Sequence, residues 1–133
     1  MKHHFSLFKT LVCLLLSVWL LPAALASDAG ASGPEPYKFV VNLGDPSNGG
    51  KYLQVQMVFE SAGPEIDHDI AVNKPRIQHA LILLLSSANP DVLLTLKGKK
   101  DLMIEVIDTV NHLLHETEKT GVKDVFFTSF IIQ

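Results

Sequence analysis

Two segments in the first half of the chain alternate between apolar and polar residues, which is the pattern of half-buried β-strands. They are Tyr37–Leu43 and Tyr52–Glu60. A dense cluster of turn-forming residues, GDPSNGG at positions 44–50, separates them. The sequence therefore predicts a β-hairpin with one buried face and one mostly hydrated face. The residues predicted to share the buried face are Tyr37, Phe39, Val41 and Leu43 in the first strand and Leu53, Val55, Met57 and Phe59 in the second.

After residue 73 the apolar residues recur every three or four positions, which predicts helices. The first helix is expected over Arg76–Ser87, with Asn73 as its cap and Pro75 in its first turn. Apolar residues continue almost all round its circumference, so we expect this helix to be buried on most sides. The preceding stretch, Ser61–Asn73, is predicted to be a connection that has room for a turn of helix.

Two further helices are predicted after the first one. The tripeptide NPD at positions 89–91 has the pattern of a cap and first turn, which indicates a short second helix. After a break at Thr95–Gly98, a longer third helix is expected over Lys99–Glu118, with Gly121 as its C-terminal cap. Its apolar stripe consists of Leu102, Met103, Val106, Ile107, Val110, Leu113 and Leu114.

The last segment, Val122–Ile132, is predicted to be a strand that is apolar on both faces. Such a strand is normally buried on both sides. We therefore expect it inside the sheet, with helix on one face and either the other helices or a second subunit on the opposite face. The fold class predicted is α+β: a small sheet, made of the N-terminal hairpin and the C-terminal strand, packed against two main helices. The two faces of the last strand would carry Val125, Phe127, Ser129 and Ile131, and Phe126, Thr128, Phe130 and Ile132.

The N-terminus has the pattern of a secretory signal peptide. A basic start is followed by an apolar run at 11–21 and by the small-residue sequence Ala24–Ala26, which predicts cleavage before Ser27. The alternative is an uncleaved membrane anchor, although a spanning helix needs roughly 20 apolar residues and Pro22 interrupts the run. The sequence thus predicts a signal peptide or anchor at 1–26, a flexible linker at 27–36 and a folded domain at 37–133, outside the cytoplasm.

Charge and cysteine content argue against several classes of function for the domain. The full chain has 11 basic and 14 acidic residues, and because Lys2 and Lys9 lie in the leader, the remainder has a net charge of −5. An acidic domain has no electrostatic basis for binding nucleic acid or anionic lipid. The single cysteine, Cys13, also lies in the leader, so neither a disulfide nor thiol chemistry is predicted for the domain. No cofactor is predicted.

Two polar motifs could carry chemistry. One face of the third helix presents two carboxylates and two imidazoles, which could bind a divalent metal or respond to pH; a plain solvated face is the simpler interpretation. The DHD motif at 67–69 could pair a carboxylate with a catalytic histidine, but no G-x-S-x-G nucleophile motif accompanies it, so a polar loop is preferred. The residues of the helix face are Glu105, Asp108, His112 and His115.

Two other groups are candidates for contact with a partner protein. A basic cluster lies at the start of the third helix, where positive charge is mildly unfavourable to the helix dipole. The cluster could contact a phosphate or an acidic partner, although a solvated helix start is the simpler interpretation. The hydrated face of the second strand is a candidate for a subunit contact. The basic cluster consists of Lys97, Lys99 and Lys100, and the strand residues are Tyr52, Gln54 and Gln56.

Five stretches of the domain carry recognisable sequence motifs that follow one another in a defined order. They are PYKFVVNL (36–43), GGKYLQVQMVFE (49–60), KPRIQHALILLLSS (74–87), LKGKKDLMIEVIDTVN (96–111) and VKDVFFTSFIIQ (122–133). Each is weak alone, but their order, spacing and ending in Gln133 resemble the family of flagellar basal-body-associated FliL proteins. The resemblance covers Tyr37–Gln133, essentially the whole predicted domain.

The resemblance implies a single-pass inner-membrane protein with a periplasmic domain similar to the stomatin/SPFH core. It implies copies assembled as a ring around the stator units of the flagellar motor. The implied function is support of torque, swimming and swarming, and of rotational direction in chemotaxis, without enzymatic activity. The front of this chain departs from the family pattern, because a segment with the pattern of a cleavable leader stands in place of the cytoplasmic stub and longer span. The alternative function is a small periplasmic metal- or ligand-binding module that uses the Glu105–His115 face.

Overall fold

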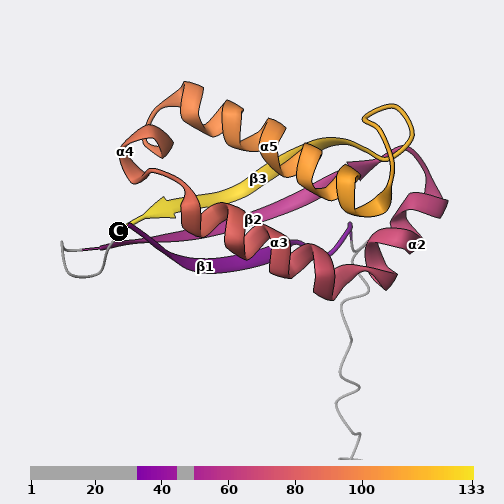
Figure 1. The fold of residues 1–133 in the computed structure, drawn as a ribbon, viewed down its shortest axis with the longest axis horizontal. Helices are drawn as coiled ribbons and strands as arrows, with labels where there is room; N and C mark the ends of the chain where they lie inside the picture. Colours follow the sequence, from indigo (N-terminus) through magenta and orange to yellow (C-terminus); the bar gives the residue numbers. More distant parts are fainter. Residues whose placement is uncertain (1–32, 45–49) are drawn as a thin grey trace, which may run out of the picture. The chain divides into compact units, whose positions relative to one another are not determined.

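A three-stranded antiparallel sheet in the order β1-β2-β3 is the framework of the protein (Figure 1). The structure, a computed structural model, describes residues 33–44 and 50–133, so the predicted leader, residues 27–32 of the predicted linker and residues 45–49 of the predicted turn lie outside it. The predicted α+β class is confirmed. In chain order the elements are β1 (Tyr37–Leu43), β2 (Lys51–Ser61), α2 (Pro64–Val72), α3 (Lys74–Ser87), α4 (Pro90–Leu93), α5 (Leu96–Leu114) and β3 (Val122–Ile132).

The predicted hairpin is confirmed, with its apolar positions facing the core. β1 pairs antiparallel with β2, which places Phe39 opposite Val55 and Val41 opposite Leu53. All four side chains are buried, whereas the residues between them on β1 are exposed. This alternation follows from the two-residue period of a strand, which sends successive side chains to opposite faces of the sheet.

Helices α3 and α5 cover one face of the sheet. α3 packs against β1 and α5 packs against β3, and the two helices contact each other (Figure 1). Burial of their apolar side chains against the sheet supplies the main stabilisation available to a domain without disulfides. Within the described residues, no helix has the length and hydropathy needed to cross a membrane. The fully buried helix residues of this core are Ile77, Leu81 and Leu85 in α3 and Val106 and Val110 in α5.

β3 is an edge strand, and the prediction that it lies inside the sheet is wrong for the described chain. It pairs with β2 alone, and the helices cover only one of its faces. Phe126 and Ile131, on the other face, are 48% and 45% exposed. The second apolar face of β3 is therefore at the surface of the domain.

An irregularity in β3 also changes which side chains face the core. Along the β2–β3 pairing, Met57 lies opposite Phe127 whereas Gln56 lies opposite Ser129, so Thr128 is an extra residue, as in a β-bulge. The alternation changes phase at that residue, and the two predicted faces of the strand are therefore wrong. The apolar side chains of β3 that belong to the core or pack against it are Val122, Val125, Phe127, Phe130 and Ile132.

The predicted connection over 61–73 contains a helix of nine residues, α2. Pro64 lies in its first turn, where a missing N–H costs nothing. Glu65 and Asp67 place negative charge at the same end, which the helix dipole favours. Ile66 and Ile70, one turn apart, are buried. The DHD motif is consequently helical rather than part of a loop.

Helix α3 is buried on one side only, contrary to the prediction. Ile82 and Leu83 are 45% and 59% exposed, because a single side of the helix faces the core. Asn73 precedes the helix as predicted, but its side chain donates to the Asp69 carbonyl (3.0 Å) instead of capping α3. The short helix α4 and its cap are confirmed, since Asn89 Oδ1 accepts from two backbone N–H groups in the first turn.

Helix α5 begins and ends earlier than predicted. Its N-cap is Thr95, whose Oγ1 accepts from the Gly98 N–H (2.9 Å), so the predicted break at this point belongs to the helix. Its C-cap is His115, which adopts the left-handed conformation with a φ of 60°. The prediction of Gly121 as the cap is therefore wrong.

Asn111 joins the end of α5 to the start of β3. Its Nδ2 donates to the Val122 carbonyl (2.9 Å) and its Oδ1 accepts from the Val122 N–H (2.7 Å). We call this buried pair of bonds the Asn111 clamp; it provides partners for two backbone groups that water cannot reach. Gly121 is needed here because a Cβ at that position would lie 2.3 Å from the Asn111 Oδ1.

Candidate functional site

The face of the sheet opposite the helices is uncovered in the described chain. Its outward residues include Val40, Tyr52, Phe126 and Ile131, which are 70%, 50%, 48% and 45% exposed. The strand register sets Val40, Gln54 and Ile131 side by side across the three strands. Several large apolar side chains on one uncovered face of a sheet are typical of a protein contact site. We call this surface the open face; its residues are Lys38, Val40, Asn42, Tyr52, Gln54, Gln56, Val58, Phe126, Ser129 and Ile131.

The three strand residues predicted as contacts, Tyr52, Gln54 and Gln56, all lie on the open face. A glutamine amide both donates and accepts hydrogen bonds, and a half-exposed tyrosine offers an apolar ring with a polar end. Such groups can form directional bonds within an apolar contact. The sequence did not predict that Phe126 and Ile131 lie on the same face as these residues. That placement depends on the phase change in β3 and on its position at the edge of the sheet, and neither can be recognised from the sequence of one strand.

The predicted basic cluster lies in the first turns of α5 and does not belong to the open face. Lys97 forms an ion pair with Asp101, one turn further along the helix. The Lys99 ammonium lies 5.2 Å from the centroid of the Phe130 ring, within the range of a cation–π interaction. Lys100 is exposed and has no ion-pair partner among the described residues.

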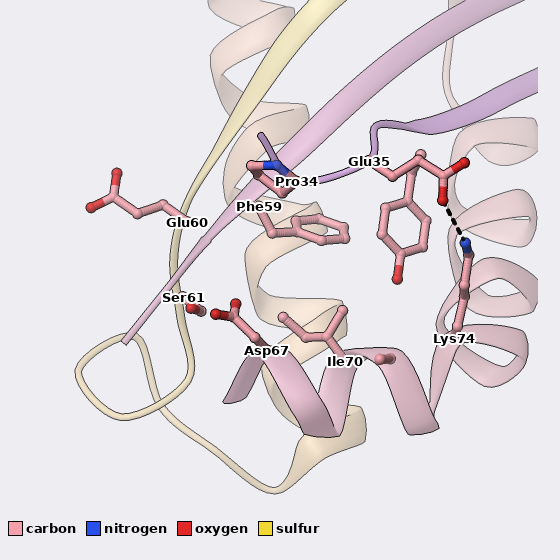
Figure 2. A pocket seen from close by; sticks show the side chains of 10 residues that line it. Pro34, Glu35, Phe59, Glu60, Ser61, Asp67, Ile70 and Lys74 are labelled. Carbon is pink, nitrogen blue, oxygen red and sulfur yellow. Dashed lines mark ion pairs between the residues drawn. The ribbon is translucent and has the colours of Figure 1, made fainter. Parts of the chain in front are cut away.

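A groove with an aromatic floor lies between α2 and the end of β2 (Figure 2). Its volume is about 480 Å³. The rings of Tyr37 and Phe59 are in tilted contact, with centroids 5.0 Å apart. Figure 2 shows Ile70 and Asp67 projecting from α2 toward this floor, and Lys74 across the groove from Asp67. The other lining residues are Pro34, Glu35, Glu60, Ser61 and Ala71.

The groove holds a cation of the domain itself. The Lys74 ammonium lies 5.5 Å from the centroid of the Tyr37 ring and 3.6 Å from a carboxylate oxygen of Glu35. Both partners are of the kind that attracts an ammonium group, the ring through its negative face and Glu35 through its charge. The groove therefore combines apolar walls with groups suited to positive charge. No feature of the sequence pattern indicates it, because its walls come from segments far apart in the chain.

Burial raises the pKa of the Tyr37 hydroxyl above its ordinary value, and the nearby Glu35 carboxylate raises it further. The folded state therefore holds this proton more tightly than the unfolded chain does. Stability from this source is present below the unfolded pKa of about 10 and is lost as pH rises through the higher folded value. We expect the melting temperature of the wild type to fall more steeply above about pH 10 than that of Tyr37→Phe. Thermal unfolding followed by circular dichroism checks this, and equal slopes would contradict it.

The polar face predicted on α5 is exposed. Glu105, Asp108, His112 and His115 are all exposed. Asp108 and His112 line a shallow depression next to α3, whereas Glu105 lines a different one beside α4. Among residues 33–44 and 50–133, no three side chains of metal-binding type are grouped closely enough to hold a metal ion. The structure does not bring the four residues together as one site.

The DHD motif is likewise divided by its position on α2. Asp67, His68 and Asp69 are all exposed, and of the three only Asp67 lines the groove. Successive residues of a helix point about 100° apart, so His68 and its neighbours do not converge.

Comparison with known proteins identifies the family. Residues 36–133 match the family model "Flagellar basal body-associated protein FliL". The chain is 33% identical over 95 residues to "Flagellar protein FliL" of Aquifex aeolicus (strain VF5), covering 71% of this chain and 56% of that relative. It is 30% identical over 96 residues to "Flagellar protein FliL" of Escherichia coli (strain K12), covering 71% of this chain and 60% of that relative. The chain belongs to the FliL family of flagellar basal body-associated proteins.

Proposed function

We propose that this protein supports the stator of the flagellar motor through protein–protein contacts on the periplasmic side of the inner membrane. Its action there is non-enzymatic and serves torque, swimming and swarming, and rotational direction in chemotaxis. Family membership supports a place at the basal body. The match covers 56% of the length of the Aquifex relative. We therefore propose this role for the matched domain and not for the remainder of that relative.

The organisation of the chain is part of the same proposal. Residues 1–26 act as a signal peptide or membrane anchor, residues 27–36 as a flexible linker, and residues 37–133 as the contact domain. Copies of the domain associate with one another and with stator and basal-body proteins, and the open face provides the main contact with the other proteins.

The observation that supports this function best is the open face. Phe126 and Ile131 of β3 lie beside the β2 row that contains Gln54 and Val58, with no described element over them. Moving apolar side chains out of water is favourable, by roughly 25 cal/mol per Å² of buried surface. A surface of this kind, interspersed with hydrogen-bonding amides, is suited to a partner protein rather than to a small substrate.

The test is complementation of a deletion strain. Deletion of the gene should shrink the swimming zone on soft agar and the swarm on hard agar. Phe126→Ser should fail to restore motility while the folded protein accumulates, because serine removes the apolar contact without disturbing the core. Leu83→Ser is the matched control, since Leu83 is also large and exposed but lies on α3. Normal motility of the deletion strain, or of the Phe126→Ser strain, would refute the proposal.

A further inference from the structure

The two ends of the sheet carry opposite charge. β2 runs from Lys51 to Ser61. At the Lys51 end lie α4 and the start of α5, tied there by the ion pair of Lys51 with Asp91 (3.2 Å) and by the contact of Lys99 with Phe130. At the Ser61 end lies α2, and Figure 1 shows α4 and α2 at opposite ends of the sheet. The start of α5 is rich in lysine, whereas α2 carries three carboxylates and neither lysine nor arginine.

The groove at the acidic end is built to take a lysine side chain. Its aromatic floor and Ile70 offer apolar surface to a long aliphatic stem. The carboxylate of Asp67 points into the groove beside Ser61, on the side away from Lys74 (Figure 2). Lys74 already shows that an ammonium group can lie against the Tyr37 ring. A second ammonium would find Asp67 as its counter-charge.

The basic end presents a lysine that is free to enter such a groove. Lys97 and Lys99 have partners within the domain, namely Asp101 and the Phe130 ring. Lys100 is exposed and forms no ion pair with any described residue. Its position near the N-terminus of α5, where the helix dipole is positive, makes contact with a carboxylate favourable.

We propose that Lys100 of one copy inserts into the Asp67 groove of a second copy. This contact specifies how copies associate, and it rests on the proposed function, which includes association of copies with one another. Because cluster and groove lie at opposite ends of the domain, the contact is heterologous: each copy uses its groove with one neighbour and its lysine with another. Such a contact repeats from copy to copy and closes into a ring or continues as an open chain, according to the rotation between neighbours.

The direct test is zero-length cross-linking of the full chain with a carbodiimide, which joins an amine to a carboxylate only when they touch. Equal amounts of ¹⁴N- and ¹⁵N-labelled protein are mixed, so that mass spectrometry distinguishes bonds between copies from bonds within one. We expect a mixed-isotope Asp67–Lys100 cross-link. We also expect its yield to fall when salt is raised to about 1 M, where charges are screened beyond about 3 Å. A cross-link found only within single copies would overturn the proposal.

Charge exchange makes the test specific. Lys100→Asp and Asp67→Lys should each lower the yield of cross-linked oligomer by at least about tenfold, the effect of losing a close charge pair and gaining a repulsive one. The double variant that combines both substitutions should restore the yield of cross-linked oligomer, because the exchanged side chains at positions 67 and 100 again form an amine–carboxylate pair. Full oligomer yield in either single variant, or no recovery in the double variant, would overturn the contact. Circular dichroism verifies folding, and the neutral variants Asp67→Asn and Lys100→Gln replace any variant that does not fold.

The outcome is separable from that of the proposed function. If Asp67 becomes linked to a lysine of a different protein in intact cells, the second copy is the wrong occupant and this inference fails. Loss of motility in Phe126→Ser would still support the stator role in that case. If Phe126→Ser cells swim and swarm normally, the proposed function fails whether or not copies are joined through Lys100.

Discussion

Replacing Asn111 by leucine is expected to lower the free energy of unfolding by about 2–5 kcal/mol, because the Val122 N–H and C=O would then both be buried without a partner. Leucine has the same branching as asparagine and is larger, so the loss would come from the missing hydrogen bonds and from crowding rather than from a cavity. The start of β3 would lose its link to α5. Urea denaturation of the wild type and the variant, followed by circular dichroism, measures the difference.

The neighbouring residue provides a control for the clamp. His112→Leu changes an adjacent position on the same helix, but its side chain is exposed and makes no clamp bond. We expect its free energy of unfolding to stay within about 0.5 kcal/mol of the wild type, as for most surface substitutions. If Asn111→Leu were as stable as His112→Leu, the clamp would not hold β3 in place.

Gly98→Ala is expected to destabilise the domain by about 1–3 kcal/mol, although alanine is the better helix former by about 1 kcal/mol. Gly98 is buried where α5 contacts α4, and a Cβ there would lie 2.0 Å from the Val92 carbonyl oxygen. That atom is backbone, so the whole of α4 has to move. The steric cost therefore outweighs the gain in helix propensity.

Glu105→Ala is the matched control for Gly98→Ala. It adds the same good helix former further along α5, at an exposed position. Thermal unfolding should show a lower melting temperature for Gly98→Ala and little change for Glu105→Ala. An increase in melting temperature for Gly98→Ala would show that α4 yields easily and that the contact between the two helices is loose.

The sequence predicted those elements whose pattern is local. β1 and β2 follow strict alternation, and Asn89 with Pro90 marks a helix start by cap chemistry alone. Helix α2 was missed although signals were present, namely Pro64 before two acidic residues and the i, i+4 pair Ile66 and Ile70. The burial of α3 was overestimated because hydropathy shows which side chains are apolar, and cannot show that only one side of the helix meets the core.

The errors on β3 and on the surfaces have a different cause. Thr128 is an extra residue only in comparison with its pairing strand β2, which lies about 70 residues earlier in the chain. A short stretch of sequence around Thr128 therefore cannot reveal the irregularity. The groove likewise brings Tyr37, Phe59 and Ile70 together from three elements. Tyr52 and Gln54 were placed correctly on the outward face of β2, because the alternation along one strand shows which of its side chains point away from the core.

The pairing of β2 with β3 has a consequence for how the protein is made. β3 is synthesised after all four described helices, yet among the described residues it is the strand that pairs with one edge of β2. Until Val122 and the residues after it have left the ribosome, one row of β2 amide and carbonyl groups has nothing to bond with, and Leu53, Val55 and Met57 lack part of their cover. An unpaired strand edge with apolar residues beside it is prone to aggregation and to capture by chaperones. The nascent chain should therefore remain a chaperone client until β3 emerges, and truncation before Val122 should yield a protein that is degraded rather than a smaller folded domain.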